Sequence, residues 1–111
     1  MKINVNNWND MQWKKVVPGL DRKVFSGEGA TVALHLIDPH GAGKPEKHVN
    51  EQIVYIIKGE CDMHIEDKVY NLKEGGIICI PPNVEHYGVS RGTEDIISLE
   101  IFTPKRPEYL K

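Results

Sequence analysis

Three potential metal ligands stand close together in the stretch Glu46-Lys47-His48-Val49-Asn50-Glu51-Gln52. Glu46 and His48 are two residues apart, so on an extended chain their side chains face the same side. Gln52 follows four residues later, about 13 Å from His48 if the chain stays extended. Ligands of one ion lie only ~2.0–2.2 Å from it. A shared metal therefore requires the chain to turn at residues 49–51, and Asn50 suits such a turn.

A fourth ligand must come from another part of the chain, and His86 is the candidate. It follows Pro81-Pro82-Asn83, where a strand ends and the chain doubles back. With Glu46, His48 and Gln52 it offers imidazole nitrogen, amide oxygen and carboxylate oxygen, without thiolate. Such a set suits one divalent ion of Fe, Mn, Co, Ni or Zn. Four protein ligands on an octahedral ion would leave two positions for water or substrate, which is typical of catalytic sites.

Other histidines, and another environment for Glu46, give alternatives to this set. If Glu46 is an exposed loop residue, the site has three protein ligands, or His40 supplies the fourth. His35 and His64 lie in strand-like runs without supporting spacing, and we assign both to strand faces.

Short runs rich in Ile, Val and Tyr surround the candidate ligands, with turn residues between them. Such residues suit pleated, half-buried strands, and their spacing predicts an all-β barrel or sandwich. We expect strands over residues 31–37, 52–57, 61–65, 69–72, 76–80 and 95–102.

The ends of the chain are predicted to lie outside the barrel, which we place at residues 21–103 of a single domain, 1–111. Residues 1–20 are expected to form an N-terminal arm that packs Trp8 and Trp13 on the barrel or on a second subunit. Residues 104–111 contain two prolines, which predicts an irregular tail or a short 3₁₀ turn.

Charge and composition exclude several classes of partner. Fourteen basic and sixteen acidic residues give a net charge of −2, so we expect neither a nucleic-acid nor an anionic-membrane partner. No apolar run approaches the ~20 residues of a bilayer span. The first seven residues lack the apolar region of a signal peptide, which predicts a cytoplasmic protein. In that compartment Cys61 and Cys79 are expected to be reduced core thiols.

The spacing of the candidate ligands resembles the two sequence motifs of the cupin superfamily. The first motif has two His two apart, then Glu, Gln or His four later, and Gly seven beyond; the matching residues are Glu46, His48, Gln52 and Gly59. The second has Gly, Pro and His, matched by Gly75, Pro81 and His86. One departure is Glu46, which stands where the family has its first His. The resemblance implies a single-domain jelly-roll barrel, also called a double-stranded β-helix, with a metal ion inside.

The C-terminal segment resembles more narrowly the small pectin-degradation cupins, which open 4,5-unsaturated uronates to linear keto acids. The tail of those enzymes carries an acid, an aromatic residue and an arginine, matched here by Glu100, Phe102 and Arg106. The resemblance implies that these three are catalytic. A carboxylate in a partly dry pocket tends toward a raised pKa and can pass protons, and an arginine can clamp a substrate carboxylate.

Each of these three residues also has a plain structural interpretation. Glu100 would be a surface residue at a strand end, Phe102 a core residue, and Arg106 a solvated charge in the tail.

Our leading hypothesis is therefore a metal-dependent cupin of isomerase or lyase type. Its small acidic substrate would be sugar-acid-like, such as an unsaturated uronate, and the reaction an isomerisation or ring opening. The alternatives are a cupin dioxygenase acting on a small organic substrate and a non-catalytic module that binds a metal or small ligand. Cupins of this size commonly pair through exposed strand edges, so we expect a homodimer.

Overall fold

The computed structural model describes residues 1–41 and 43–111, and β-strands dominate it. In sequence order the strands are β1 (Lys14–Val17), β2 (Leu20–Ser26), β3 (Thr31–Ile37), β4 (Glu51–Lys58), β5 (Glu60–Ile65), β6 (Lys68–Leu72), β7 (Ile77–Ile80), β8 (His86–Arg91) and β9 (Ile96–Thr103). Two short 3₁₀ helices, η1 (Trp8–Asp10) and η2 (Pro107–Leu110), lie near the two ends. The expected all-β class is confirmed.

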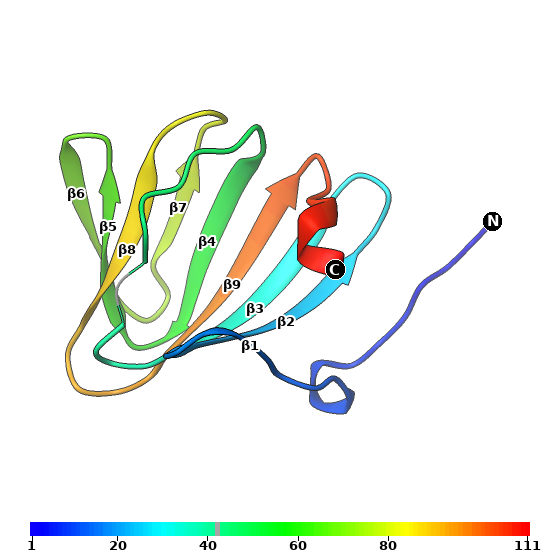
Figure 1. Cartoon of the computed structure of the whole chain (residues 1–111), viewed down its shortest axis with the longest axis horizontal. Helices are drawn as coiled ribbons and strands as arrows, with labels where there is room; N and C mark the ends of the chain where they lie inside the picture. The colour runs from blue at the N-terminus through cyan, green and yellow to red at the C-terminus, as the bar shows by residue number, and fades with distance from the viewer. Residues whose placement is uncertain (42) are drawn as a thin grey trace.

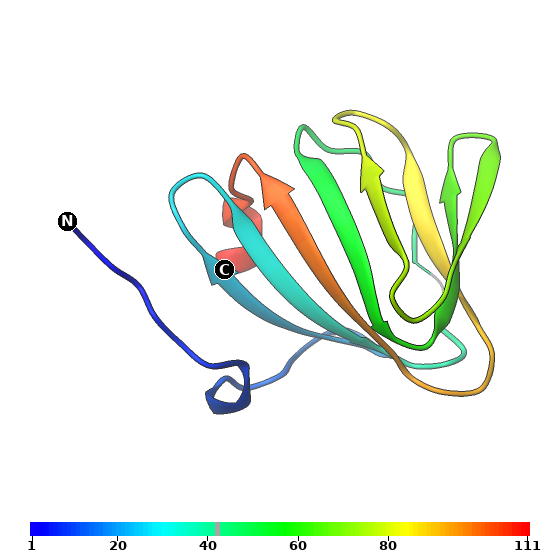
Figure 2. The ribbon, with the colours of Figure 1, turned by 180° about the vertical axis from the view of Figure 1, so that it is seen from behind.

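The strands form two antiparallel sheets that face each other as a jelly-roll barrel (Figure 1). The larger sheet has the order β1-β2-β3-β9-β4-β7, and the smaller has the order β6-β5-β8. The helix η2 lies beside the end of β9, and the N-terminal residues run away from both sheets (Figure 2).

The six runs predicted as strands correspond to β3, β4, β5, β6, β7 and β9. Three further strands, β1, β2 and β8, were not predicted, because their sequences lack a clear apolar alternation. The charged residue Lys23 can be buried in β2 because its ammonium group has partners on the N-terminal segment. The Lys23 ammonium donates to the carbonyl oxygen of Trp8 at 2.7 Å and lies 4.5 Å from the ring centre of Trp13. Within the segment predicted as an arm, Trp8 and Trp13 thus contact the barrel, and Lys14–Val17 form β1, which pairs with β2.

The apolar core lies between β4, β7 and the start of β9 in the larger sheet and the strands β5 and β6 of the smaller one. Its buried members are Val54, Ile56, Cys61, Met63, Leu72, Ile80 and Ile96. The turn from β4 to β5 needs Gly59, whose φ of +92° favours glycine and where a Cβ would lie 2.9 Å from the carbonyl oxygen of Asp95. This glycine allows the chain to turn tightly beside the core, where β4 leads into β5.

The strand register brings polar residues onto the inner face of the larger sheet. Across β3, β9 and β4, Thr31 pairs with Phe102 and Phe102 with Gln52. One step along each strand on the same face, Ala33 pairs with Glu100. These pairings place residues far apart in sequence next to one another inside the barrel.

The two cysteines differ in environment. Both are free; Cys61 is buried in the core, where burial raises the pKa of its thiol to about 11, whereas Cys79 is exposed. The prediction of a core position is therefore wrong for Cys79, which lies on the outer side of the edge strand β7. None of the described helices is long and apolar enough to cross a membrane.

Candidate metal centre

Two loops at one end of the barrel are joined by backbone hydrogen bonds. Glu46 and His86 form an isolated antiparallel bridge, with N–H to O=C distances of 2.9 and 3.0 Å. The amide of Asn83 donates to the carbonyl of His48 at 2.7 Å, and Asn83 has a positive φ of 61°. Asn tolerates this left-handed conformation better than most residues, which explains its place in the turn. The bridge holds both candidate-ligand segments at one place.

The bend expected before Gln52 is present. β4 begins only at Glu51, and the buried Asn50 donates from Nδ2 to the carbonyl oxygen of Pro104 at 2.6 Å. The turn is therefore anchored to the C-terminal segment, and it brings Gln52 Oε1 to 3.0 Å from His48 Nε2.

The predicted ligands converge. Ligand atoms of Glu46, His48 and His86 all lie within 4.8 Å of one another. The Nε2 atom of His48 lies 3.5 Å from Glu46 Oε1. Neighbouring ligands that bind one ion at about 2.1 Å lie about 3.0–3.4 Å apart. The 3.5 Å separation is close to this range, whereas the 4.8 Å limit of the whole group is looser, so binding would draw the side chains together. His40 is exposed and lies outside this group.

Hydrogen bonds orient two of these candidate ligands. His86 Nδ1 is 2.8 Å from the carbonyl oxygen of Val84, which must accept, so Nδ1 carries the proton and Nε2 keeps its lone pair. The Gln52 amide donates from Nε2 to Glu100 Oε1 at 2.7 Å, which leaves its oxygen toward His48. Such second contacts are how proteins usually fix metal-binding side chains.

His48 has the electrostatics of a ligand. Burial, followed by the charge of Arg106, lowers its pKa, and the neutral imidazole is the form that binds metals. Its Nδ1 atom is buried and has no hydrogen-bond partner among the described residues. The opposite ring nitrogen, Nε2, is the one that faces Glu46 and Gln52. Nitrogen and oxygen donors of this kind fit a divalent transition ion, so the residues present suit the predicted metal.

Glu100 is an inner-face residue whose side chain is 13% exposed, so it is not a surface residue. Its Oε2 accepts from His35 Nδ1 at 2.7 Å and from the Ser98 hydroxyl at 2.9 Å. Burial alone would raise the pKa of Glu100, but these hydrogen bonds, the contact with His35 and the charge of Arg22 lower it to about 2. The expected raised pKa is therefore wrong, because the pocket is dry but rich in donors.

Arg106 is buried, and the interpretation as a solvated tail charge fails. Its Nη1 donates to Glu46 Oε1 and to the Tyr109 hydroxyl, both at 3.0 Å, and its Nε donates to Glu108 Oε2 at 3.0 Å. Among the described residues, its Nη2 has no hydrogen-bond partner. Phe102 is fully buried, with its ring 5.7 Å from that of His48 and 5.2 Å from that of Tyr109.

The comparisons with known proteins agree with this geometry. The model of the cupin domain family matches residues 33–102. The chain belongs to the cupin domain family.

Two curated cupin relatives carry informative names. The pectin degradation protein KdgF of Dickeya dadantii is 28% identical over 104 residues, 92% of this chain and 94% of that protein. An H2HPP isomerase of Bacillus subtilis is 30% identical over 99 residues, 88% of this chain. This cupin spans only 42% of that isomerase.

Solved structures share the fold. KdgF from a Halomonas species superposes with a TM-score of 0.85 at 22% identity, over 93% of this cupin and 96% of that chain. An RmlC-like cupin from Shewanella frigidimarina gives 0.88 at 19% identity, over 97% and 96%.

Three residues beside the cupin site were not predicted as part of it: Arg22, His35 and Tyr109. His35 lies on a strand face, as assigned, but this is the buried inner face of β3, where it is 4% exposed and bonds to Glu100. The sequence could have identified His35 as an inward-facing residue, because it alternates with Thr31 and Ala33 on the inner face of β3. Arg22 and Tyr109 gave no such signal, since only the tertiary fold stacks the Arg22 guanidinium 3.7 Å from the Tyr109 ring centre. His64 lies on β5 as expected, stacked on Tyr87.

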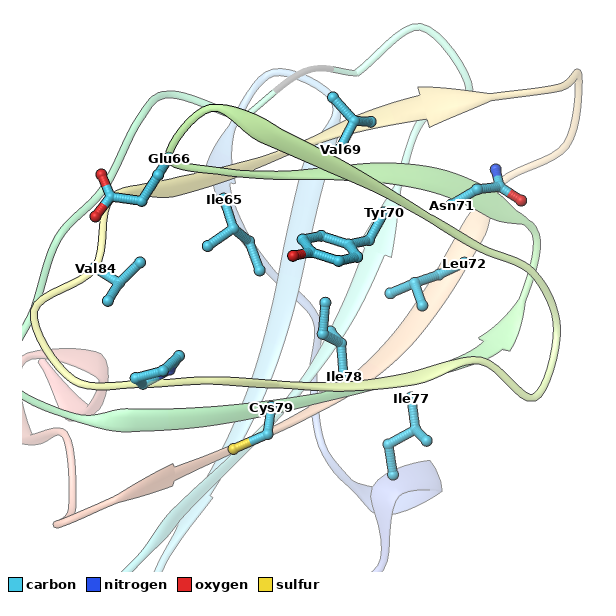
Figure 3. A pocket seen from close by; sticks show the side chains of 11 residues that line it. Ile65, Glu66, Val69, Tyr70, Asn71, Leu72, Ile77, Ile78, Cys79 and Val84 are labelled. Carbon is cyan, nitrogen blue, oxygen red and sulfur yellow. The ribbon is translucent and has the colours of Figure 1, made fainter.

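A separate groove of about 760 Å³ lies where the edge strands β6 and β7 approach each other (Figure 3). It is largely apolar, with Ile65, Tyr70 and Ile78 among the lining residues. None of the candidate ligands lines it, so the groove is distinct from the metal centre.

Proposed function

We propose that this cupin is a metal-dependent enzyme that acts on a small, sugar-acid-like substrate by ring opening or isomerisation. An unsaturated uronate is the first substrate to test. The main observation that supports this proposal is the contact between Arg106 and Glu46, which puts a buried guanidinium beside the group of candidate ligands. The names of the two relatives, a pectin degradation protein and an isomerase, support the same class of chemistry.

In this proposal Glu46, His48, Gln52 and His86 hold the ion, which would act as a Lewis acid that polarises a substrate oxygen. The negative charge of Glu46 distinguishes this site from one with imidazole at that position. Arg106 offsets part of this charge, which would otherwise repel an acidic substrate. The site can therefore hold a dication and an acidic substrate at the same time.

Arg106 is proposed to bind the substrate carboxylate through Nη2. Its other nitrogens are fixed by Glu46, Tyr109 and Glu108, so the guanidinium is oriented before substrate arrives. A preorganised charged donor loses little entropy on binding. Phe102 supplies the apolar wall beneath His48.

Glu100 and Tyr109 are proposed to keep fixed protonation states near neutral pH. The carboxylate stays ionised and orients Gln52. Burial and the charge of Glu100 raise the pKa of Tyr109 to about 12, so its hydroxyl remains protonated. Tyr109 therefore presents a neutral hydroxyl beside Arg106.

The test measures turnover of a panel of 4,5-unsaturated uronates. Turnover is monitored as the loss of the ultraviolet absorbance of the double bond. The protein is loaded in turn with Fe, Mn, Co, Ni or Zn and assayed with and without oxygen. We expect oxygen-independent turnover that chelation abolishes. Strict dependence on oxygen would indicate the dioxygenase instead, and metal binding without any turnover would indicate a binding module.

The variant Arg106→Lys separates substrate binding from metal binding. Lysine keeps a positive charge near Glu46 but loses the planar fork, so we expect KM to rise roughly tenfold, as for loss of one charged hydrogen bond. Metal content should stay unchanged. Arg91→Lys, at an exposed pair with Asp62, is the matched control and should leave KM unaltered. An unchanged KM in Arg106→Lys would contradict the assigned clamp.

We also propose that the protein is a homodimer, and a cytoplasmic location stays a prediction. Large apolar residues are exposed at both edges of the larger sheet: Trp13, Val16 and Val17 on the arm and β1, and Tyr55, Ile57 and Ile77 on β4 and β7. Surfaces of this kind commonly bind protein partners. Sedimentation equilibrium should give twice the chain mass; a monomer at micromolar concentration would contradict the proposal.

A further inference from the structure

A line of hydrogen bonds crosses the inner face of the larger sheet and ends at the candidate metal centre. Arg22 Nε on β2 is 2.8 Å from His35 Nε2 on β3. His35 Nδ1 is 2.7 Å from Glu100 Oε2 on β9. Glu100 Oε1 is 2.7 Å from Gln52 Nε2 on β4. Four strands therefore contribute one residue each to a continuous relay.

The direction of every bond in the relay follows from its first member. A guanidinium can only donate, so His35 Nε2 must accept from Arg22. The remaining proton of the neutral imidazole is then on Nδ1 and is donated to Glu100. The carboxylate accepts on both oxygens, so Gln52 must present its NH₂ group to Glu100 and its oxygen to His48.

The orientation of Gln52 matters because only one end of an amide can bind a metal. The carbonyl oxygen has lone pairs to donate, whereas the NH₂ group is a hydrogen-bond donor. Glu100 Oε1 is the acceptor that holds the NH₂ end of Gln52, at 2.7 Å. If the bond from His35 to Glu100 were lost, the carboxylate could move, and the Gln52 amide would lose the contact that directs its oxygen at His48.

We propose that Arg22 and His35 are positioning residues for the metal centre, which hold Glu100 as an acceptor and thereby keep the Gln52 oxygen directed at the ion. This inference rests on the proposed metal-dependent function. Neither residue touches the ligand group; both act through Glu100 and Gln52. Arg22 is also fixed from its other side by the ring of Tyr109, 3.7 Å away. The relay is thus tied to η2, the element that carries this ring.

The test uses Co²⁺, whose affinity is measured by calorimetry and whose visible spectrum reports the number of ligands. In the full-length protein, His35→Leu should lower Co²⁺ affinity by about 10- to 100-fold, the usual cost of losing an outer contact of a metal ligand. The spectrum should show the loss of one oxygen ligand. His64→Leu, the same substitution at a histidine of the smaller sheet, should leave both unchanged.

A double-mutant cycle separates positioning from a general structural effect. In Gln52→Ala the relay has no ligand to orient, so adding His35→Leu should cause no further loss of Co²⁺ affinity. An equal loss in the two backgrounds would overturn the inference, as would unchanged affinity in His35→Leu alone.

Two further variants keep the test decisive if His35→Leu does not fold. His35→Asn places an amide nitrogen near the position of Nδ1 and should retain most of the Co²⁺ affinity. Ser98→Ala removes one donor to Glu100 without removing the imidazole and should cost affinity only while Gln52 is present. If the unmutated protein binds no Co²⁺ or other tested divalent ion, the proposed function itself fails; if it binds Co²⁺ but no variant of the relay affects binding, only this inference fails.

Discussion

The barrel interior has two regions built on different physics. On the β4–β7 side, Ile56, Ile80 and Met63 pack as an apolar core in which no single contact dominates. On the β2–β3–β9 side, His35, Ser98 and Glu100 are held by directional hydrogen bonds at 2.7–2.9 Å. Burial stabilises the first region in proportion to area, whereas the second depends on each donor meeting its acceptor. The comparison predicts that changes in the first region act mainly on stability and changes in the second act mainly on the site.

The sharpest test of this separation removes both imidazoles of the ligand group, His48 and His86. The double alanine variant should lose more than the roughly 100-fold in metal affinity that an outer contact costs, because it loses two ligands directly. Its free energy of unfolding without metal should also fall, because both rings are buried and leave a cavity, so metal content is measured on the folded fraction. Elemental analysis and chemical denaturation measure the two quantities. Retention of stoichiometric metal would contradict the assigned ligands.

The converse change lies in the apolar region. Ile56 is 1% exposed, and Ile56→Ala should cost about 2–5 kcal/mol of unfolding free energy through lost burial and a residual cavity. Metal affinity measured on the folded fraction should stay unchanged. Urea denaturation with and without Co²⁺ checks both; a parallel loss of affinity would show that the two regions are coupled.

The smallest expected effect concerns acid stability. The folded-state pKa of Glu100, about 2, lies below the ordinary value of 4.5, so its carboxylate stabilises the folded protein above about pH 4.5. That contribution, on the order of 3 kcal/mol at most, is lost as the pH falls from 4.5 toward 2. Glu100→Gln should lack this share of the pH dependence, whereas the exposed control Glu85→Gln should keep it. Identical acid profiles for wild type and Glu100→Gln would contradict the relay's charge assignment.

Local sequence patterns were enough to predict the apolar strands and the positions of the candidate ligands. The alternation in residues 31–37 and 52–57 identified β3 and β4, and the spacing of Glu46, His48 and Gln52 required the bend that the structure contains. Strand β2 was missed because Asp21, Arg22 and Lys23 conceal its pattern, and their partners lie on other elements. The pKa of Glu100 was predicted in the wrong direction for the same reason: burial can be inferred from sequence, but the donors from His35 and Ser98 cannot.

The central claim is that side chains from the loop before β4, from β4 itself and from the start of β8 bind one ion inside the barrel. X-ray absorption spectroscopy of the zinc- or cobalt-loaded protein tests it most directly. We predict a single type of site with only nitrogen and oxygen neighbours, including two imidazoles, and the loss of one imidazole contribution in each of His48→Ala and His86→Ala. Sulfur neighbours, or a spectrum unaltered by both substitutions, would contradict the account.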